Sequence, residues 1–297
     1  MTPITFHPAA SSDQPTFSIL IPSWNNLAYL KCCISSIRKN SRYHHQIIIH
    51  VNEGKDGTLA WVREQGFDHT YSAENAGVCY GFNAPSALVR SDYMVLSDDD
   101  YYYAPDWDHY LMEELQKLDH IYFCLTGTMI EHSESQYKSI ITQKDFGKTV
   151  DQFEEDHFLK EFKNFPFDDW NGGNWYPLVM HSHMWKLIGG LSTEFTPGMA
   201  SDPDMMMKLW QAGVRYFKGV SQSRVYHFVS KSTARVKKND GNKQFLLKWG
   251  ISKSTFFDHY LRLGEPFQGN TPPPDRTKFY WKWKRDRWKR LFSTWRS

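Results

Sequence analysis

Three consecutive aspartates, Asp98 to Asp100, directly follow the apolar run Tyr93 to Ser97. The run predicts a short buried strand, so the three carboxylates come together at one strand end. Three acids there repel one another and cost free energy unless a cation lies among them. A Mg²⁺ or Mn²⁺ held by one or two carboxylates, with its other positions on substrate phosphates, is the ordinary use of such a site. A solvated acidic turn is the alternative, because aspartate is also a favoured loop residue.

Asp202 and His227 are two further candidates for chemistry. Asp202 precedes Pro203, a pair typical of a helix start, with the aspartate as cap and the proline in the first helical position. A helix N-terminus also favours the ionised carboxylate, which is the form that accepts a proton. His227 follows Arg224-Val225-Tyr226 at the predicted end of a strand. A lone histidine is usually structural, so a ligand role is here the less favoured alternative.

The segment Trp170-Asn171-Gly172-Gly173-Asn174-Trp175 combines aromatic rings with glycines and amides. Aromatic faces stack on sugar rings, and glycine lets the backbone approach a ligand. The segment therefore predicts a sugar-binding loop with Trp170, Asn171, Gly172 and Gly173 as contacts. A tryptophan-anchored loop inside the core is the alternative.

The elements that must position these residues alternate along the first hundred residues. Strands are predicted at 17–21, 46–51, 69–72 and 93–97, and helices from 25 or 26 to 37, over 58–65 and over 83–89. This order predicts an α/β fold with a mostly parallel sheet flanked by helices. Ligands bind outside the carboxyl ends of such strands, which here carry Pro22-Ser23-Trp24, Asn52-Glu53 and the aspartate triplet. Farther on, a strand is predicted over 121–130 and an amphipathic helix over 150–163.

Composition narrows the class of protein. The 297 residues are 40% hydrophobic and 23% charged, which is ordinary for a soluble globular protein. Cys32, Cys33, Cys79 and Cys124 show no metal-ligand spacing and are typical of buried residues in a reducing compartment. We see neither a secretory leader nor an apolar run long enough to cross a bilayer. The sequence therefore predicts a cytoplasmic protein, at most peripheral to the inner face of a membrane.

The C-terminal segment 276–297 differs from the rest in charge. It contains nine Lys or Arg residues against one acid, Asp286, which gives +8; because the whole chain is +2, the other 275 residues carry about −6. One helical face gathers its apolar residues, namely Trp281, Trp288, Leu291, Phe292 and Trp295. This pattern favours a basic amphipathic helix on an anionic membrane surface. A nucleic-acid arm, or a helix packed on the acidic body, is the alternative.

In order and spacing, these pieces resemble the family-two inverting glycosyltransferases of the GT-A fold. The similarity covers roughly residues 16 to 228, with a gap near 130–170. Its motifs are Ile19 to Asn26, Ile47 to Thr58, Asn75-Ala76-Gly77 with Asn83, Asp92 to Asp100, Leu187 to Leu191, Gly198 to Asp204 and Leu209 to Gly213. The chain has Asn52-Glu53 where the family usually has an Asp pair, and Ser201-Asp202 where Glu-Asp is common. The resemblance implies a nucleotide-sugar donor, a divalent metal and inversion at the anomeric carbon.

By position, the resemblance assigns roles to single residues. Asp98 and Asp100 would be the outer members of the Asp-X-Asp motif, with Asp100 the chief metal ligand and Asp98 nearer the ribose or a metal-bound water. His227 would be a further metal ligand, and Asp202 the general base. The sugar-binding loop with Trp170, Asn171, Gly172 and Gly173 would lie on the acceptor side. The predicted nucleotide-sugar contacts are Pro22, Ser23, Trp24, Asn52, Glu53, Asn75, Gly77, Asn83, Asp98 and Asp99.

The prediction is thus a Mn²⁺- or Mg²⁺-dependent transferase that moves a sugar to a hydroxyl of a glycan or lipid-linked acceptor, with no nucleic-acid partner. A sugar-nucleotide nucleotidyltransferase is the first alternative, but it would need a Gly-rich, basic loop after the first strand. A non-catalytic glycan-binding protein on the same fold is the second. The predicted organisation is a disordered segment at 1–15, a GT-A domain at 16–230 (nucleotide-sugar half 16–110, acceptor half 111–230), a helical extension at 231–271, and a proline spacer with a basic aromatic tail at 272–297.

Overall fold

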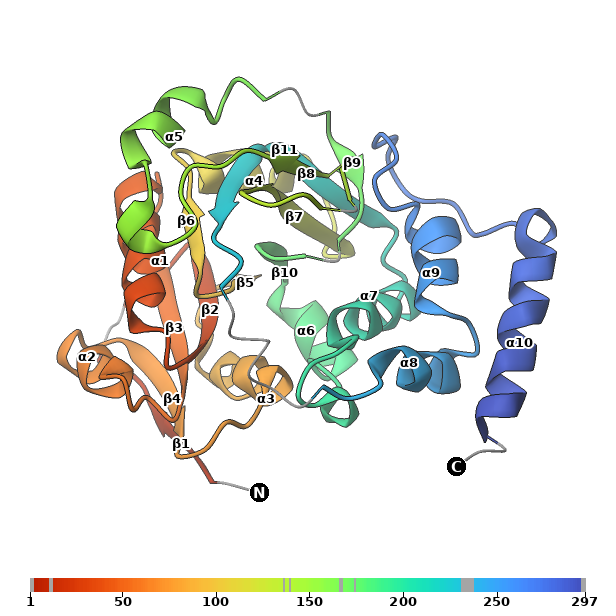
Figure 1. Cartoon of the computed structure of the whole chain (residues 1–297), viewed down its shortest axis with the longest axis horizontal. Helices are drawn as coiled ribbons and strands as arrows, with labels where there is room; N and C mark the ends of the chain where they lie inside the picture. The colour runs from red at the N-terminus through yellow and green to blue at the C-terminus, as the bar shows by residue number, and fades with distance from the viewer. Residues whose placement is uncertain are drawn as a thin grey trace.

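The computed structural model describes residues 3–10, 13–135, 137–138, 140–165, 168–173, 175–230 and 238–294. A mixed β-sheet flanked by helices runs through the molecule (Figure 1). Four parallel strands form its N-terminal part, in the spatial order β4 (Asp68–Ser72), β3 (His45–Asn52), β2 (Phe17–Trp24) and β5 (Tyr93–Leu96). The α/β class and the parallel strands predicted for this part are therefore confirmed.

The helices that connect these strands are α1 (Leu27–Asn40), α2 (Thr58–Glu64) and α3 (Val78–Asn83). The first two match the predicted ranges, but the helix predicted over 83–89 is wrong in position. The α-helix ends at Asn83, and a separate 3₁₀ turn spans Pro85–Leu88. Proline has no N–H and its ring clashes with the preceding turn, so Pro85 starts a new turn instead of continuing α3.

Beyond β5 the sheet becomes mixed. β10 (Leu178–His181) lies antiparallel between β5 and β7 (Phe123–Glu131), and β11 (Tyr216–His227) runs parallel to β7. β6 (Tyr101–Tyr103) then pairs antiparallel with the end of β11. Both predicted halves of the domain thus contribute strands to one sheet. The pairing of β6 with β11 brings the residues after Asp100 beside His227.

The remaining strands lie at edges. β8 (Ile141–Gln143) pairs with β7, and β9 (Trp170–Asn171) pairs with β11. β1 (Ile4–His7) pairs antiparallel with β4, so the prediction that residues 1–15 are disordered is wrong for this stretch. An edge strand is held by backbone hydrogen bonds and needs little apolar pattern. The stacked rings of His7 and His69, 4.6 Å apart, add a side-chain contact.

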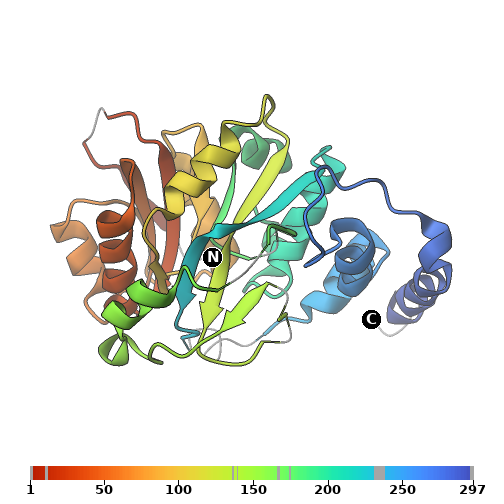
Figure 2. The same ribbon diagram turned by 90° about the horizontal axis from the view of Figure 1, so that it is seen from above.

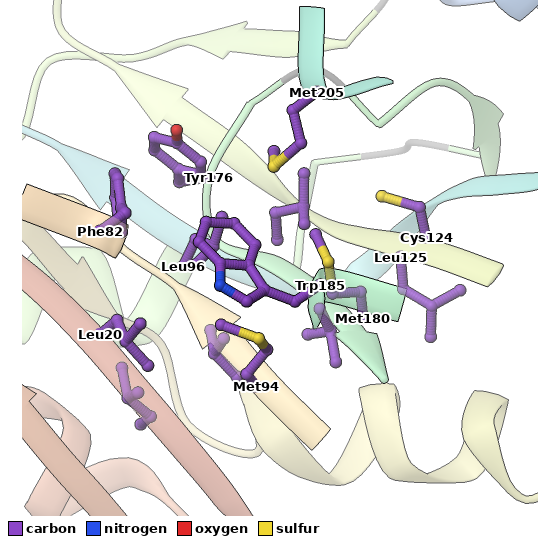
Figure 3. Packing of buried hydrophobic residues seen from close by; sticks show 14 of the residues in the cluster. Leu20, Phe82, Met94, Leu96, Cys124, Leu125, Tyr176, Met180, Trp185 and Met205 are labelled. Atoms are coloured by element: carbon purple, nitrogen blue, oxygen red, sulfur yellow. The ribbon is translucent and has the colours of Figure 1, made fainter. Parts of the chain in front are cut away.

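A core of apolar side chains lies between the sheet and the helices α4 (Trp107–Leu115), α6 (Ser182–Ile188) and α7 (Ser201–Gln211). Figure 3 shows Trp185 of α6 among Met94, Leu96 and Met180 of the neighbouring strands. Tyr176 lies at the edge of this cluster, with its ring 5.0 Å from that of Phe82. A second, aromatic cluster supports α5 (Glu155–Glu161), which covers the central part of the predicted helix 150–163.

The C-terminal extension forms α8 (Gly241–Trp249), α9 (Lys253–Phe256) and α10 (Tyr280–Thr294). α8 and α9 lie near α7, and α10 lies outermost, at the end of the molecule opposite α1 and α2 (Figures 1 and 2). The predicted C-terminal helix is therefore present, although Trp295 of the predicted apolar face is outside the described residues. Within the described chain, no helix is both long enough and apolar enough to cross a membrane.

Candidate active site

A pocket of about 500 Å³ opens at the carboxyl ends of β2, β3 and β5 and reaches the first turn of α7. Most of the predicted site residues line it together. From the donor side these are Pro22, Ser23, Trp24, Asn52, Asn75 and Gly77, and across the pocket they are Asp98, Asp99, Asp100, Asp202 and His227. Parallel strands end at one edge of a sheet, which explains how segments so distant in sequence meet here.

Asp99 is turned toward the turn after β2. Its carboxylate accepts hydrogen bonds from Ser23 Oγ at 2.6 Å and from Asn26 Nδ2 at 2.9 Å. Burial raises the pKa of Asp99, and the charge of Asp100 raises it further. Asp99 therefore ties the first strand end to the acidic strand end and fixes the shape of the donor side.

The negative charge of the triplet concentrates on Asp100. Burial opposes its ionisation, but the charge and hydrogen bond of His227 and the N–H of Ser230, at 2.7 Å, hold the pKa of Asp100 below its usual value. Asp98 accepts a hydrogen bond from the Tyr101 hydroxyl at 3.0 Å. Burial, followed by the charge of Asp100, raises the pKa of Asp98. Two neighbouring buried carboxylates thus compete for ionisation, and a cation would relieve that competition.

His227 lies between two carboxylates. Its Nδ1 is 2.7 Å from Glu131 Oε1, and its Nε2 is 3.5 Å from Asp100 Oδ2. Burial by itself would lower the pKa of His227, but Asp100 and Glu131 together raise it to about 10. The imidazole thus holds Nε2 toward Asp100 while Glu131 fixes the other ring nitrogen.

These residues fit a divalent cation. Among the described residues, no three His, Cys, Asp or Glu side chains are already grouped to hold a metal. Such a group is not required, because Mg²⁺ is usually held by one or two carboxylates and completed by water and substrate phosphates. Asp98 and Asp100 supply carboxylate oxygens within one pocket, and Nε2 of His227 supplies a third donor once a metal displaces its proton. Glu131 on Nδ1 gives the carboxylate–histidine pair that commonly orients a metal-ligating ring.

Asp202 faces the same pocket from the first turn of α7. Tyr176 donates a hydrogen bond from its hydroxyl to Asp202 Oδ1 at 2.6 Å, and Ser201 Oγ lies 3.3 Å from the same oxygen. Burial raises the pKa of Asp202 to about 6, although the bonds from Tyr176 and Ser201 act in the opposite direction. A carboxylate with such a pKa is ionised at neutral pH and is still basic enough to take a proton.

The expectation that Asp202 caps α7 is wrong. The helix begins at Ser201 with Ala200 as its N-cap, and no side chain makes a capping hydrogen bond. The carboxylate of Asp202 is bound by Tyr176 instead of by the helix backbone. The capping explanation for this residue is therefore removed.

Asn75 and Gly77 shape the donor side through the backbone. Asn75 Oδ1 accepts from Gly77 N at 2.9 Å, and Asn52 Oδ1 accepts from Ala76 N at 2.8 Å. Gly77 has φ +81°, and a Cβ there would lie 3.0 Å from Pro197 Cα. Glycine is needed for this φ and for the close approach of the loop that leads to α7.

Two predicted donor contacts do not line the pocket. Glu53 forms an ion pair with Lys55 at 3.2 Å and accepts from Asn25 Nδ2, so its carboxylate is used within the loop after β3. Asn83 bonds with both the N–H and the C=O of Leu191 at 2.8 Å and joins α3 to the loop after α6. The structure thus gives both residues positioning roles.

The predicted acceptor contacts at Trp170 to Gly173 also lie outside the pocket. Trp170 is buried, and its indole donates to Thr128 Oγ1 at 3.2 Å. A Cβ on Gly219 would come within 1.9 Å of this indole, and one on Gly172 within 2.0 Å. These two glycines therefore leave room for the ring of Trp170 and not for a ligand. The segment is better described by the alternative, a tryptophan-anchored loop inside the core.

Several pocket residues were not predicted as contacts, among them Glu131, Tyr137, Trp175 and Tyr176. The rings of Tyr137 and Trp175 are 4.5 Å apart in an edge-to-face arrangement. Glu131 is the last residue of β7, and the other three fall in the long stretch between β7 and β10, where the sequence has little periodicity. Trp175, at the end of the predicted aromatic segment, was the nearest signal.

Comparisons with known proteins show what the chain is similar to in sequence and in fold. The family model for glycosyl transferase family 2 matches residues 18–174, which is more than half of the chain. No curated protein sequence matches the chain. Among solved structures, residues 1–349 of Staphylococcus aureus TarS match with a TM-score of 0.52 and 12% identity, over 71% of this chain and 60% of that chain.

Two structures with bound ligands are similar to the same degree. TarS 1–349 in complex with UDP matches with a TM-score of 0.53 and 12% identity, over 82% of this chain and 74% of that one. The mannosyltransferase PcManGT from Pyrobaculum calidifontis, in complex with GDP-Man and Mn²⁺, matches with a TM-score of 0.53 and 14% identity, over 97% and 74%. These likenesses show a shared fold. Together with the family match and the predicted motifs, they establish that the chain belongs to glycosyl transferase family 2 and has its GT-A fold.

Proposed function

We propose that the enzyme transfers a sugar with inversion from a nucleoside-diphosphate sugar to a hydroxyl group of a glycan or lipid-linked acceptor, with Mn²⁺ or Mg²⁺ as cofactor. The observation that carries this proposal is that Asp100, His227 and Asp202 line one pocket. The ligands of the similar structures, UDP in one and GDP-Man with Mn²⁺ in another, support the donor class.

On the donor side, Pro22, Ser23, Trp24 and Asn52 bind the nucleoside, and the loop with Asn75 and Gly77 borders it. Asp98 and Asp99 complete this wall, and Asp100, Asp98 and His227 would hold the cation. A cation there supplies positive charge for the diphosphate as the glycosidic bond breaks. Glu131 fixes the ring of His227 through Nδ1.

On the acceptor side, Asp202 takes the proton of the attacking hydroxyl. Inversion requires this base on the face of the sugar opposite the leaving diphosphate. Tyr176 keeps one oxygen of Asp202 engaged, so the other oxygen is available for the acceptor. The rings of Tyr137 and Trp175 offer apolar faces on which a sugar can stack, in place of the predicted contacts at Trp170 to Gly173.

The location proposed for this reaction is the cytoplasm, at the inner face of a membrane. The four cysteines are all free, which supports a reducing compartment. Nucleotide sugars and a lipid-linked acceptor would meet there.

Thermal unfolding with a panel of nucleoside diphosphates, with and without Mn²⁺, tests the proposal. A ligand at 100 times its Kd stabilises a protein by about 2.7 kcal/mol, which raises the unfolding temperature measurably. Because the proposed site binds the diphosphate through a cation, one nucleotide should give this rise only when Mn²⁺ is present. The anomeric configuration of the product, read by NMR, tests inversion. Stabilisation by no nucleotide, or retention in the product, would contradict the proposal.

A further inference from the structure

The apolar side chains that stand exposed are unevenly distributed. Among the described residues, nine large ones are exposed, and five of them lie on α10. Four form what we call the outward stripe: Trp281, Trp288, Leu291 and Phe292, exposed by 78%, 60%, 59% and 65%. Trp288 follows Trp281 by seven residues, and Leu291 and Phe292 follow Trp288 by three and four, which places all four along one side of the helix.

The opposite side of α10 is held against the molecule. Asp286 is fully buried, and its Oδ2 accepts hydrogen bonds from Ser252 N, Ser252 Oγ and Thr255 Oγ1 at 2.5–2.9 Å. The ring of Phe279, just before the helix, stacks on that of His259 at 4.3 Å. These contacts fix the rotation of α10, so the outward stripe faces away from the protein.

The charge of α10 is entirely positive on its exposed surface. Asp286 is the one acid of segment 276–297, and its carboxylate is buried against α9. Lys284 and Arg285 lie between Trp281 and Trp288 along the helix. Arg287 and Lys289 are further exposed basic residues of the helix, whereas Lys282 pairs with Asp258 and Arg290 lies against Gly250. The exposed side of α10 thus combines an apolar stripe with cations around it.

We propose that α10 docks the enzyme on an anionic lipid bilayer, with the outward stripe inserted among the lipid chains near the headgroups and the Lys and Arg side chains on lipid phosphates. Aromatic and aliphatic side chains in the interface, surrounded by cations, are the arrangement that such a surface binds. A nucleic acid would use the cations but offers no apolar partner for Leu291. The surface is independent of the donor pocket, so this inference and the proposed glycosyl transfer can fail separately.

Vesicle sedimentation of the full chain tests the proposal. Wild type should bind vesicles of phosphatidylcholine with phosphatidylglycerol and bind far less to phosphatidylcholine alone. The variant Trp281→Ser/Trp288→Ser should lower the vesicle partition coefficient by at least about tenfold, since the burial of even one large apolar side chain changes such a coefficient by about that factor. Lys284→Gln/Arg285→Gln should lose about fivefold per charge at low salt. Because all four side chains are partly or fully exposed, these variants should stay folded, and circular dichroism checks this.

The matched control is Lys186→Gln/Leu187→Ser, which removes one exposed cation and one exposed apolar side chain from α6. It should bind like wild type. Equal binding by wild type and the tryptophan variant, or no binding of wild type to anionic vesicles, overturns the proposal. So does binding that a duplex oligonucleotide abolishes and that the tryptophan substitutions leave unchanged, because the surface would then be a nucleic-acid site.

Discussion

At the scale of single residues, Asp100 is the carboxylate on which donor binding should depend. It is the member of the triplet whose pKa is held below its usual value, and it faces His227. Burial, followed by the charge of Asp100, raises the pKa of both Asp98 and Asp99. A cation is therefore attracted most strongly by the negative charge of Asp100. Asp98 and Asp99 carry less charge and serve mainly to position neighbouring groups.

Asp100→Asn should weaken Mn²⁺-dependent binding of the nucleoside diphosphate by more than about 10-fold, because even a supporting partner of a metal ligand is worth 10–100-fold. The amide still offers an oxygen to Ser230 N, so the fold should persist. Calorimetric titration measures the affinity. Asp119→Asn, at an exposed carboxylate after α4, is the control and should titrate like wild type. An Asp100→Asn variant with wild-type affinity in Mn²⁺ would show that the triplet does not hold the metal.

Asp202 should act in chemistry and not in donor binding. Its pKa of about 6 predicts that kcat/KM is constant at neutral pH and falls as pH drops below about 6, because the protonated base cannot accept the acceptor proton. Asp202→Asn should lower turnover by about 10²-fold or more while the thermal shift with nucleotide stays at the wild-type value. Wild-type turnover in this variant would remove Asp202 from the reaction.

Tyr176→Phe separates positioning from proton transfer at the same place. The Tyr176 hydroxyl stabilises the ionised form of Asp202, so its loss should raise the pKa of Asp202. The acid limb of the pH–rate profile should then move to higher pH while activity persists at alkaline pH. An unmoved limb would mean that the hydrogen bond has no influence on the base.

At the scale of elements, the buried carboxylate of Asp286 is one of the contacts that attach α10 to the molecule. Asp286→Ala leaves Ser252 and Thr255 without their shared acceptor, which costs roughly 1–3 kcal/mol. Tryptic cleavage in segment 276–294 of the native protein should therefore accelerate by about tenfold. Asp258→Ala, which removes an exposed ion pair with Lys282 beside the same helix, is the control and should change cleavage little. Equal cleavage of both variants would show that Asp286 does not hold α10.

At the scale of the whole molecule, the C-terminal extension is part of the support of the active site. Asp204, two residues after Asp202, is fully buried and accepts from Ser192 Oγ at 2.6 Å and Trp249 Nε1 at 2.8 Å. It also pairs with Lys248 at 2.9 Å. A Cβ on Gly241 would come within 1.9 Å of Met199 O, so α8 begins directly on the loop before α7. The extension and the catalytic helix should therefore unfold together.

Asp204→Ala should lower the free energy of unfolding by about 3–5 kcal/mol, the cost of breaking a buried ion pair. Calorimetry should show one transition, shifted down by roughly 10 °C on the scale of a few degrees per kcal/mol. Glu194→Ala removes the exposed partner of the same lysine, at 2.6 Å, and should cost no more than about 1 kcal/mol. Two separate transitions in wild type would contradict a shared folding unit.

Much of the donor side could be predicted from the sequence because its signals are local. The apolar runs before Pro22, Asn52 and Asp98 define strands by their own periodicity, and parallel strands end at the same edge. The pair Asp202-Pro203 likewise predicts the start of a helix from adjacent residues, and the family resemblance alone assigned Asp202 to the active site. The basic aromatic pattern of the tail likewise predicts a helix from neighbouring residues alone.

Only the tertiary structure decided which side chains face the pocket in the second half of the domain. Trp170 and Trp175 are the same residue type in one short segment, so the sequence does not distinguish them. Gly219 on β11 makes room for the ring of Trp170 in the core, whereas Trp175 lines the pocket. Glu131 reaches His227 because the parallel pairing of β7 with β11 sets the two residues opposite each other. The sequence by itself therefore determined the strand ends and their charges, since these depend on adjacent residues. The direction of each side chain between β7 and β10, and the side of α10 that stays exposed, depend on packing between segments far apart in the chain, which no local pattern encodes.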